Sequence, residues 1–194
     1  MGIMRIFALI IMSCKNMYLY HYYDKDIGPF KNISELPDEE AVALMERLAV
    51  EKKNAFCNKR NSEYLAKRHY YEDILREKFL EKGGKITRKV PYYMVVGECK
   101  FLEGWYENSA YIKINIDDFD KNTISFTYGD SHPTFSDKIN DNKEYRKKLY
   151  TYDEILDIID RYGLPQDWNS DGSFGPERYV EVHIWSDEVI KRYK

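Results

Sequence analysis

The chain is poor in the residues that cross-link a fold. It has only three cysteines, Cys14, Cys57 and Cys99. They are odd in number and far apart, so their spacing gives neither a disulfide framework nor a CxxC metal motif. This usage is typical of a reducing compartment and predicts a cytoplasmic protein. No apolar run is long enough to span a bilayer, so we expect no membrane-spanning segment.

Common signatures of enzyme chemistry are also missing. No G-x-G-x-x-G follows a predicted strand, which argues against a Rossmann dinucleotide site. No G-x-x-x-x-G-K-[ST], G-x-S-x-G or H-E-x-x-H motif occurs either. The formal net charge of −3 lacks the basic excess of a dedicated DNA-binding protein, so we expect no DNA partner.

What the chain does contain fits a folded globular domain. Its 194 residues suit one domain, and 43% apolar with 32% charged residues exclude a disordered or membrane composition. Tyrosine is unusually frequent, with 18 Tyr against 9 Phe and 3 Trp. Tyrosine has an apolar body and a polar tip, so it is found in half-wet cores and in pockets that hold rings.

Charge is unevenly spread along the chain. Residues 52–89 hold 12 Lys or Arg against five Asp or Glu, while the rest of the chain is acidic. A basic middle segment predicts either a site for an anionic ligand or a solvated helix face whose charges are balanced by the acidic flanks.

The first 16 residues form a segment of their own in the sequence. Seven apolar residues, 6–12, follow Arg5 and precede Ser13 and Cys14, which weakly resembles a lipoprotein signal. Met17 stands where a start codon could lie. We expect residues 1–16 to be an N-terminal extension, with a lipid anchor at Cys14 as the alternative.

Periodicity and capping signals divide residues 17–194 into helices and strands. Pro37 and the acidic residues after it predict a helix to about Lys53. A second helix is predicted from about Asn61 to Lys82, and a third from Thr151 to Arg161. Strands are predicted over 17–23, 90–97, 110–117, 123–128 and 179–185. This mixture, without a βαβ rhythm, predicts a single α+β domain with a mostly antiparallel sheet packed by three helices.

An arginine lies on the apolar stripe of the second helix. Projection at 100° per residue places Tyr64, Tyr71, Leu75 and Phe79 on one face with Arg68 among them. A buried lone charge is costly, so Arg68 needs a partner. It is predicted either to form a structural ion pair or to point a cation into a pocket.

Four stretches resemble a family of uncharacterised bacterial proteins: YHYYDKDIGPFKNISELPDEEA, KGGKITRKVPYYMVVG, ISFTYGDSHPTFSD and KEYRKKLYTYDEILDIIDRYGLPQDWNSDGSFGPERYVEV. The resemblance covers about residues 17–194 and leaves residues 1–16 outside. It implies that 17–194 fold as one cytoplasmic unit. It transfers no catalytic residue to this chain.

The loop DWNSDG matches the first half of a calcium-binding loop. Asp167, Asn169 and Asp171, followed by Gly172, place oxygen ligands at alternate positions. The bidentate Glu expected at position 178 is Arg178, and a strand follows where a helix is usual. The stretch therefore predicts either a calcium site or a turn held by side-chain to backbone bonds.

A histidine on the first strand and a glutamate on the last give a second constellation. His21 and Glu181 are placed like the His and Glu of ADP-ribosyltransferase-like folds, with Tyr93 or Tyr128 between them. That likeness implies that the His holds a ribose and the Glu stabilises oxocarbenium character. His21 is followed by two Tyr where that class has a small residue. The alternative is a hydrogen-bonded strand histidine and an exposed sheet glutamate.

The loop YGDSHPTFSD, 128–137, gives a third candidate. Asp130 and His132 could ligate a metal or exchange a proton, although Gly129 and Pro133 also suit a plain turn. Long loops are often functional, and Arg88 and Tyr93 could add a cation and a stacking ring to the same pocket.

Three hypotheses follow from these patterns. The leading one is a small enzyme or binder of a nucleotide or another anionic small molecule. In it Arg68, Arg88, Tyr93, Tyr128 and Asp130 bind the ligand. In the same hypothesis His21, His132 and Glu181 transfer protons. The alternatives are a protein-interaction module and a calcium-stabilised structural domain.

Overall fold

The structure is a computed structural model that describes residues 17–58 and 63–194. Residues 1–16, with Cys14, lie outside the described residues, as does the predicted start of the second helix. Three longer helices are present, α2 (Asp38–Glu51), α3 (Tyr64–Glu81) and α6 (Tyr152–Tyr162). Short helices are α4 (Lys100–Glu103), α5 (Ser131–Phe135) and α7 (Pro165–Trp168). No helix of the described ranges is both long and apolar enough to cross a membrane.

Single 3-10 turns join these elements. They are η1 (Ile33–Glu35), η2 (Phe56–Asn58), η3 (Ile116–Asp118), η4 (Lys121–Thr123) and η5 (Ile190–Arg192). Asn32 begins η1 by accepting a hydrogen bond from the backbone N of Ser34. This cap fixes the loop that lies over α3, and the loop supplies two side chains to the site described below.

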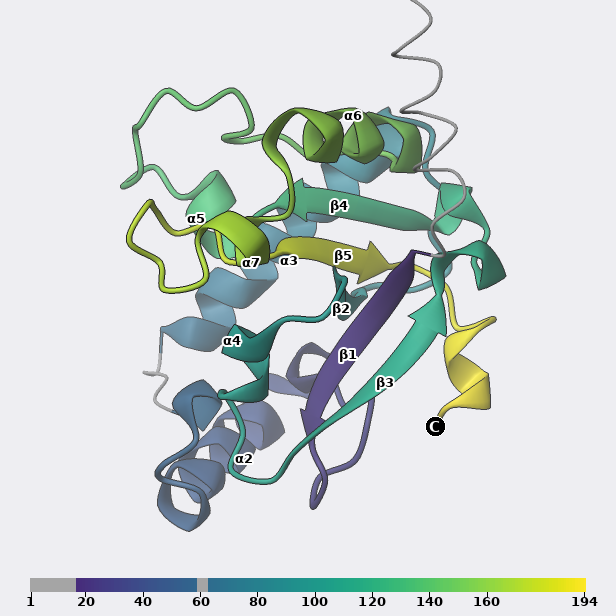
Figure 1. The fold of residues 1–194 in the computed structure, drawn as a ribbon. Coiled ribbons are helices and arrows are strands. Elements are labelled where there is room, and N and C mark those ends of the chain that lie inside the picture. The colour runs from purple at the N-terminus through teal and green to yellow at the C-terminus, as the bar shows by residue number, and fades with distance from the viewer. Residues whose placement is uncertain (1–16, 59–62) are drawn as a thin grey trace, which may run out of the picture.

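Five strands form one antiparallel sheet: β1 (Tyr18–Asp24), β2 (Tyr92–Val96), β3 (Ser109–Asn115), β4 (Ile124–Tyr128) and β5 (Val180–Ile184). Their order is β3-β1-β2-β5-β4, and each neighbouring pair is antiparallel (Figure 1). The predicted α+β fold with an antiparallel sheet is confirmed. The order brings β2 and β5, which are far apart in the sequence, together at the centre.

The sheet separates an apolar layer from a polar one. On one face, Val182 and Ile184 of β5 pack in a core with Ile155 and Ile158 of α6. On the other face, Trp185 packs against Leu75 and Phe79 of α3. The helix α3 passes behind β4 and β5 in Figure 1, so that second face is covered as well.

Polar side chains fill much of the layer between the sheet and α3. Strand partners share a face, and His183 is paired with Tyr93 on one side and with Ser125 on the other. Ser125, Thr127, Glu181 and His183 are all buried. An alternating strand usually turns its polar residues to water, so this buried polar layer is a candidate location for a functional site.

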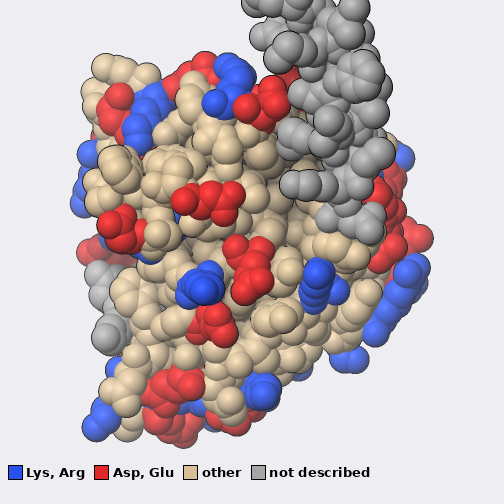
Figure 2. All heavy atoms as spheres, in the orientation of Figure 1, with Lys and Arg blue, Asp and Glu red and all other residues tan. Residues whose placement is uncertain are grey.

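The outer surface has mixed charge. Figure 2 shows basic and acidic side chains interspersed on the visible face, without a patch of one sign. Many of the basic residues of segment 52–89 have acidic partners, such as Lys52 with Asp24 and Lys82 with Glu154. Lys52 and Lys82 thus have charge partners in the acidic flanks, as the alternative of a charge-balanced surface predicts.

Candidate functional site

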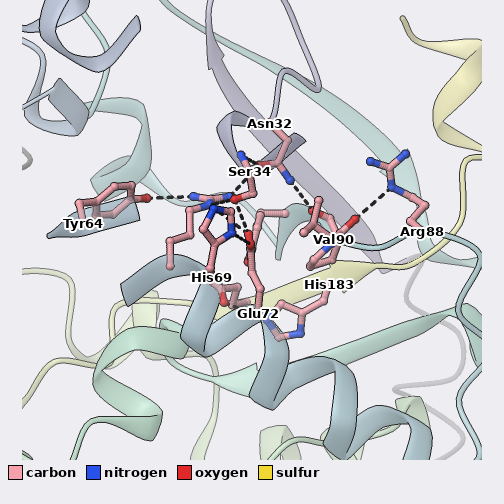
Figure 3. Close-up of polar contacts among 12 residues, drawn as sticks. Asn32, Ser34, Tyr64, His69, Glu72, Arg88, Val90 and His183 are labelled. Atoms are coloured by element: carbon pink, nitrogen blue, oxygen red, sulfur yellow. Dashed lines mark hydrogen bonds and ion pairs between the residues drawn. The ribbon is translucent and has the colours of Figure 1, made fainter. Parts of the chain in front are cut away.

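Each nitrogen of the Arg68 guanidinium, on α3, donates a hydrogen bond. Its partners Asn32, Ser34, Tyr64 and Glu72 lie close together in Figure 3. Its Nε donates to Ser34 Oγ at 2.7 Å and to Glu72 Oε1 at 3.0 Å. Its terminal nitrogens donate to the Tyr64 hydroxyl at 2.9 Å and to Asn32 Oδ1 at 3.1 Å. The side chain is 18% exposed. Of the two alternatives predicted for Arg68, the structure therefore agrees with a structural ion pair and not with a cation that points into a pocket.

Glu72 is the partner that sequence reasoning missed. It lies one helical turn after Arg68 and is buried, and its Oε1 also accepts hydrogen bonds from Ser34 and from the Tyr93 hydroxyl at 3.0 Å. The guanidinium lies over the Tyr93 ring, 4.7 Å from its centroid. The spacing of four residues between Arg68 and Glu72 on one helix could have predicted this ion pair from the sequence. Because Glu72 balances its charge, Arg68 is not free to hold an anionic ligand.

His21, Arg88 and Tyr128 do not join Arg68 in a common pocket, contrary to the leading hypothesis. Arg88 lies over the Tyr92 ring at 3.6 Å and pairs with Asp187 at 2.7 Å. Tyr128 lies on the opposite face of the sheet and donates to the carbonyl of Gly163 at 2.8 Å. Each of these side chains is therefore used to hold the fold.

His21 has both ring nitrogens occupied by the backbone. Its Nδ1 lies 2.9 Å from the carbonyl oxygen of Tyr93, and its Nε2 accepts from the N–H of Phe30 at 2.9 Å. Its ring stacks on Phe30, with centroids 4.1 Å apart. Burial lowers the pKa of His21 to about 4, so the ring is neutral at physiological pH. His21 is therefore a hydrogen-bonded strand histidine and not a residue that could hold a ribose. It has no free nitrogen for proton transfer.

Glu181 and Asp130 are brought together at the other end of the polar layer. Asp130 caps α5 by accepting from the backbone N of His132 at 2.8 Å, and it accepts from the Tyr179 hydroxyl at 2.7 Å. Glu181 Oε1 accepts a hydrogen bond from the backbone N of Ser131, the residue between Asp130 and His132, at 3.2 Å. The cap geometry of α5 thus fixes both carboxyl groups. The alternative prediction of an exposed Glu181 is wrong, because this residue is buried.

A chain of hydrogen bonds extends from Glu181 into the core. His183 Nε2 lies 2.9 Å from Glu181 Oε1, and its Nδ1 lies 3.1 Å from Ser125 Oγ. Trp185 Nε1 donates to the same Oγ at 2.9 Å. The chain has the residue types of a Ser-His-Glu triad, but Ser125 and His183 are fully buried. It therefore orients Glu181 and offers no accessible nucleophile.

The buried Glu181 and the half-buried Asp130 differ from the other buried carboxylates in lacking a Lys or Arg partner. Asp24 pairs with Lys52 at 2.8 Å, Glu72 pairs with Arg68, and Glu177 pairs with Lys143 at 3.0 Å and with Arg146. Within the described ranges, no Lys or Arg lies within 4.0 Å of the carboxylate oxygens of Glu181 or Asp130. Burying carboxylates without cations is unfavourable, so this pair is an exception to be explained.

The two carboxyl groups of the pair lie in different surroundings. Burial, followed by the charge of Glu181, raises the pKa of Asp130 above its usual range. Asp130 is half-buried, and Glu181 keeps 9% of its side chain exposed. Among the described residues, Glu181 Oε2 accepts no hydrogen bond, whereas Oε1 accepts two. The site thus combines a carboxyl group whose pKa is raised with a carboxylate oxygen that accepts no hydrogen bond from the described residues.

His132 contributes its backbone to this site and directs its ring elsewhere. The imidazole lies edge-to-face against Tyr71, with centroids 5.0 Å apart. Among the described residues, no ion pair within 4.0 Å joins this ring to the Asp130 carboxylate, but an electrostatic interaction with His132 opposes the rise in the pKa of Asp130. Over the described ranges, no group of three or more His, Cys, Asp or Glu residues is arranged to hold a metal ion.

The DWNSDG loop is held by hydrogen bonds within the protein. Asn169 is fully buried, and its Nδ2 donates to the carbonyls of Gly175 at 3.0 Å and Glu177 at 2.6 Å. Its Oδ1 accepts from the backbone N of Phe174, and Asp171 accepts twice from Ser173. Asp167 lies on the short helix α7. The calcium alternative is not supported by this arrangement, which is the turn held by side-chain bonds.

Comparisons of the chain with protein-family models, with curated proteins and with solved structures find no match. The candidate site therefore stands on its own geometry. Of the predicted residues, Arg68, Tyr93, Asp130 and Glu181 lie in one polar layer, while His21, Arg88, Tyr128 and the calcium loop lie outside it. Ser125, Tyr179 and His183 were missed as site residues, although the alternation of 179–185 had placed two of them on the face of Glu181.

Proposed function

We propose that the chain is a small enzyme that transfers protons to and from a small-molecule substrate at Asp130 and Glu181. The observation that supports this is the uncompensated carboxyl pair, since the other buried carboxylates named above have a Lys or Arg partner. General acid–base catalysis requires one group that donates a proton and one that accepts it, and the raised pKa of Asp130 together with the unbonded Oε2 of Glu181 supports these two roles. Asp130 would act as the acid and Glu181 as the base.

The roles of the surrounding residues follow from their contacts. Tyr179 and the α5 amide hold Asp130, and His183 with the amide of Ser131 holds Oε1 of Glu181. These are positioning residues, because their polar atoms are already paired with the carboxyl groups. The Tyr93 ring contacts both Arg68 and the His183 ring, so it joins the two ends of the polar layer.

The charge of the pair restricts the part of the substrate that reacts. A negative group placed beside Glu181 would be repelled, so the reacting part is neutral or cationic. A nucleotide or another anionic small molecule remains our proposal for the substrate as a whole, with its anionic group away from the pair. Arg68 does not supply the cation for that group, since Glu72 already balances it.

The test is turnover of a small-molecule panel by the purified chain, followed by mass spectrometry. The panel contains nucleosides, nucleotides, sugar phosphates and esters, each incubated with the wild-type chain, Asp130→Asn and Glu181→Gln. We expect at least one compound to be consumed and each variant to lose about 100-fold or more of that rate. Asp24→Asn, which removes a buried carboxylate paired with Lys52, is the matched control.

Two results would contradict the proposal. One is a wild-type chain that consumes none of the panel and gains no thermal stability from any member of it, since a bound substrate raises stability by mass action. The other is a rate that survives in both carboxyl variants. Circular dichroism of each variant shows whether it is folded, so a lost rate in an unfolded protein is not counted.

A further inference from the structure

A hollow of about 420 Å³ lies between the C-terminal end of α3 and α6, apart from the carboxyl pair. In Figure 1 α3 ends behind α6, and residues 147–150 close the third side. We call this hollow the α3–α6 groove. Its volume is within the range of sites that bind small molecules.

Basic side chains dominate the lining of the α3–α6 groove. They are Lys78, Lys82, Lys147, Lys148 and Arg161. The acidic residues of the lining are Glu81, Glu154 and Asp157. The cations come from two helices and a loop, so they surround the hollow instead of following one helix face.

Three of these cations have acidic partners that a ligand can displace. Lys82 pairs with Glu154 at 2.7 Å, Lys147 with Asp137 at 2.5 Å, and Arg161 with Glu144 at 2.5 Å. All three pairs are solvent-exposed, and exposed pairs contribute little to stability. These ion pairs keep the cations near the groove. Because each pair contributes little to stability, an anion that replaces the carboxylate loses little free energy by breaking it.

The other two cations have no acidic partner. No carboxylate within the described ranges lies at ion-pair distance from Lys78 or Lys148. Lys78 extends over the ring of Phe135, 6.0 Å from its centroid, at the end of α5. These two ammonium groups are available to an incoming anion without the loss of an existing bond.

One residue of the groove lining, Tyr150, carries an unsatisfied hydroxyl. Tyr150 is only 6% exposed, and its buried hydroxyl has no hydrogen-bond partner among the described residues. Its backbone is fixed by two hydrogen bonds to Phe126 of β4, at 2.8 and 2.9 Å. Burial raises the pKa of this hydroxyl, which keeps it a donor at physiological pH. A buried donor without an acceptor is costly, and an anion in the groove would supply the acceptor.

We infer that the α3–α6 groove binds a phosphorylated small molecule, with the phosphate between Lys78, Lys148 and the Tyr150 hydroxyl. Lysine presents three donors on a flexible stem and suits a tetrahedral anion. The groove is larger than a phosphate ion, so the remainder of the ligand occupies the space beside α6. This inference does not rest on the proposed acid–base function.

The experiment is isothermal titration with inorganic phosphate, ribose 5-phosphate and AMP at matched ionic strength. We expect saturable binding of the two esters, weakened about tenfold in Lys148→Glu and in Tyr150→Phe. Lys31→Glu is the matched control, because Lys31 is exposed on a distant loop and the substitution changes the net charge equally. Lys148 and Tyr150 belong to the lining of the groove and not to the Asp130–Glu181 pair, so a loss of affinity in their variants separates this test from that of the acid–base site.

A second measurement concerns the free protein. Without a ligand, Tyr150→Phe should unfold at the same or a higher temperature, since it removes an unsatisfied hydroxyl. The inference is overturned if neither ester binds saturably, or if Lys31→Glu weakens binding as much as Lys148→Glu. It is also overturned if Tyr150→Phe leaves the affinity for both esters unchanged.

Discussion

The hydroxyl of Tyr179 donates a 2.7 Å hydrogen bond to Oδ2 of Asp130, a carboxyl group that has no Lys or Arg partner among the described residues. Tyr179 precedes β5, and Asp130 ends the turn after β4, so neighbouring strands bring them together. The tyrosine and the capped helix α5 fix Asp130 next to Glu181 without compensating its charge. That arrangement has a consequence for stability that can be measured apart from any activity.

Asp130→Asn is expected to stabilise the protein at neutral pH. Burial and the charge of Glu181 raise the pKa of Asp130 in the folded state. The contribution of the protonated carboxyl to stability is therefore present below the ordinary aspartate pKa of about 4, and is lost as the pH rises through the raised value. Asparagine keeps the cap and carries no charge. Urea unfolding of both proteins across this pH range should show an advantage for the variant that disappears in acid.

Asp24→Asn provides the contrast for that measurement. Asp24 is the buried partner of Lys52, so its loss leaves this lysine with only the exposed Asp26 and should destabilise the protein. If Asp130→Asn destabilised the protein at neutral pH as Asp24→Asn does, the assignment of Asp130 as an uncompensated group would be wrong.

His21→Gln is expected to reduce the loss of stability in mild acid. The unfolded chain binds a proton at His21 below about 6.5, whereas the folded protein does so only near 4. The free energy of unfolding therefore falls as the pH drops through this interval, by up to about 3 kcal/mol. Glutamine retains a donor for Tyr93 and an acceptor for Phe30 but does not titrate. Thermal melts at several pH values should give a flatter profile for the variant, and an unchanged profile would contradict the neutral, buried histidine.

Arg68→Met is expected to destabilise the fold by about 3 kcal/mol, because it leaves Glu72 buried without a cation. Combining it with Glu72→Leu removes the unpaired charge, so the double variant should be more stable than Arg68→Met alone. Chemical denaturation of the two single variants and the double variant gives the coupling energy. Additive effects would show that the two side chains do not depend on each other.

Patterns within one element were enough to predict most of the fold. The alternation of 110–117 and of 179–185 predicted β3 and β5, and the Thr151–Glu154 capping box predicted the start of α6. These signals are local, because an apolar period or a cap depends on neighbours in the chain. The five-residue helix α5 was missed within a loop that carries turn residues.

Which residues form the site depends on contacts between segments far apart in the chain, and local sequence patterns do not predict such contacts. Leu19 pairs with Val96, so His21 lies on the face of Leu19, while Tyr93 lies on the opposite face with its partner His183. The order and register of the strands therefore place His21 and Glu181 on opposite faces of the sheet, where they cannot form a common site. Polar residues on an alternating strand are usually solvent-facing, so the burial of Glu181 and His183 could be seen only once α3 was placed over them.

Calcium is expected to leave the stability of the protein unchanged, whereas Asn169→Ala should lower it. Asn169 makes three hydrogen bonds to the loop 174–177 from a fully buried position. Its loss leaves buried carbonyls and an amide unsatisfied, at a cost of about 1–3 kcal/mol. Thermal melts with calcium and with a chelator should coincide for the wild-type chain. A melting temperature that rises with calcium, and does so less in Asp171→Asn, would show instead that the loop oxygens rearrange around the ion.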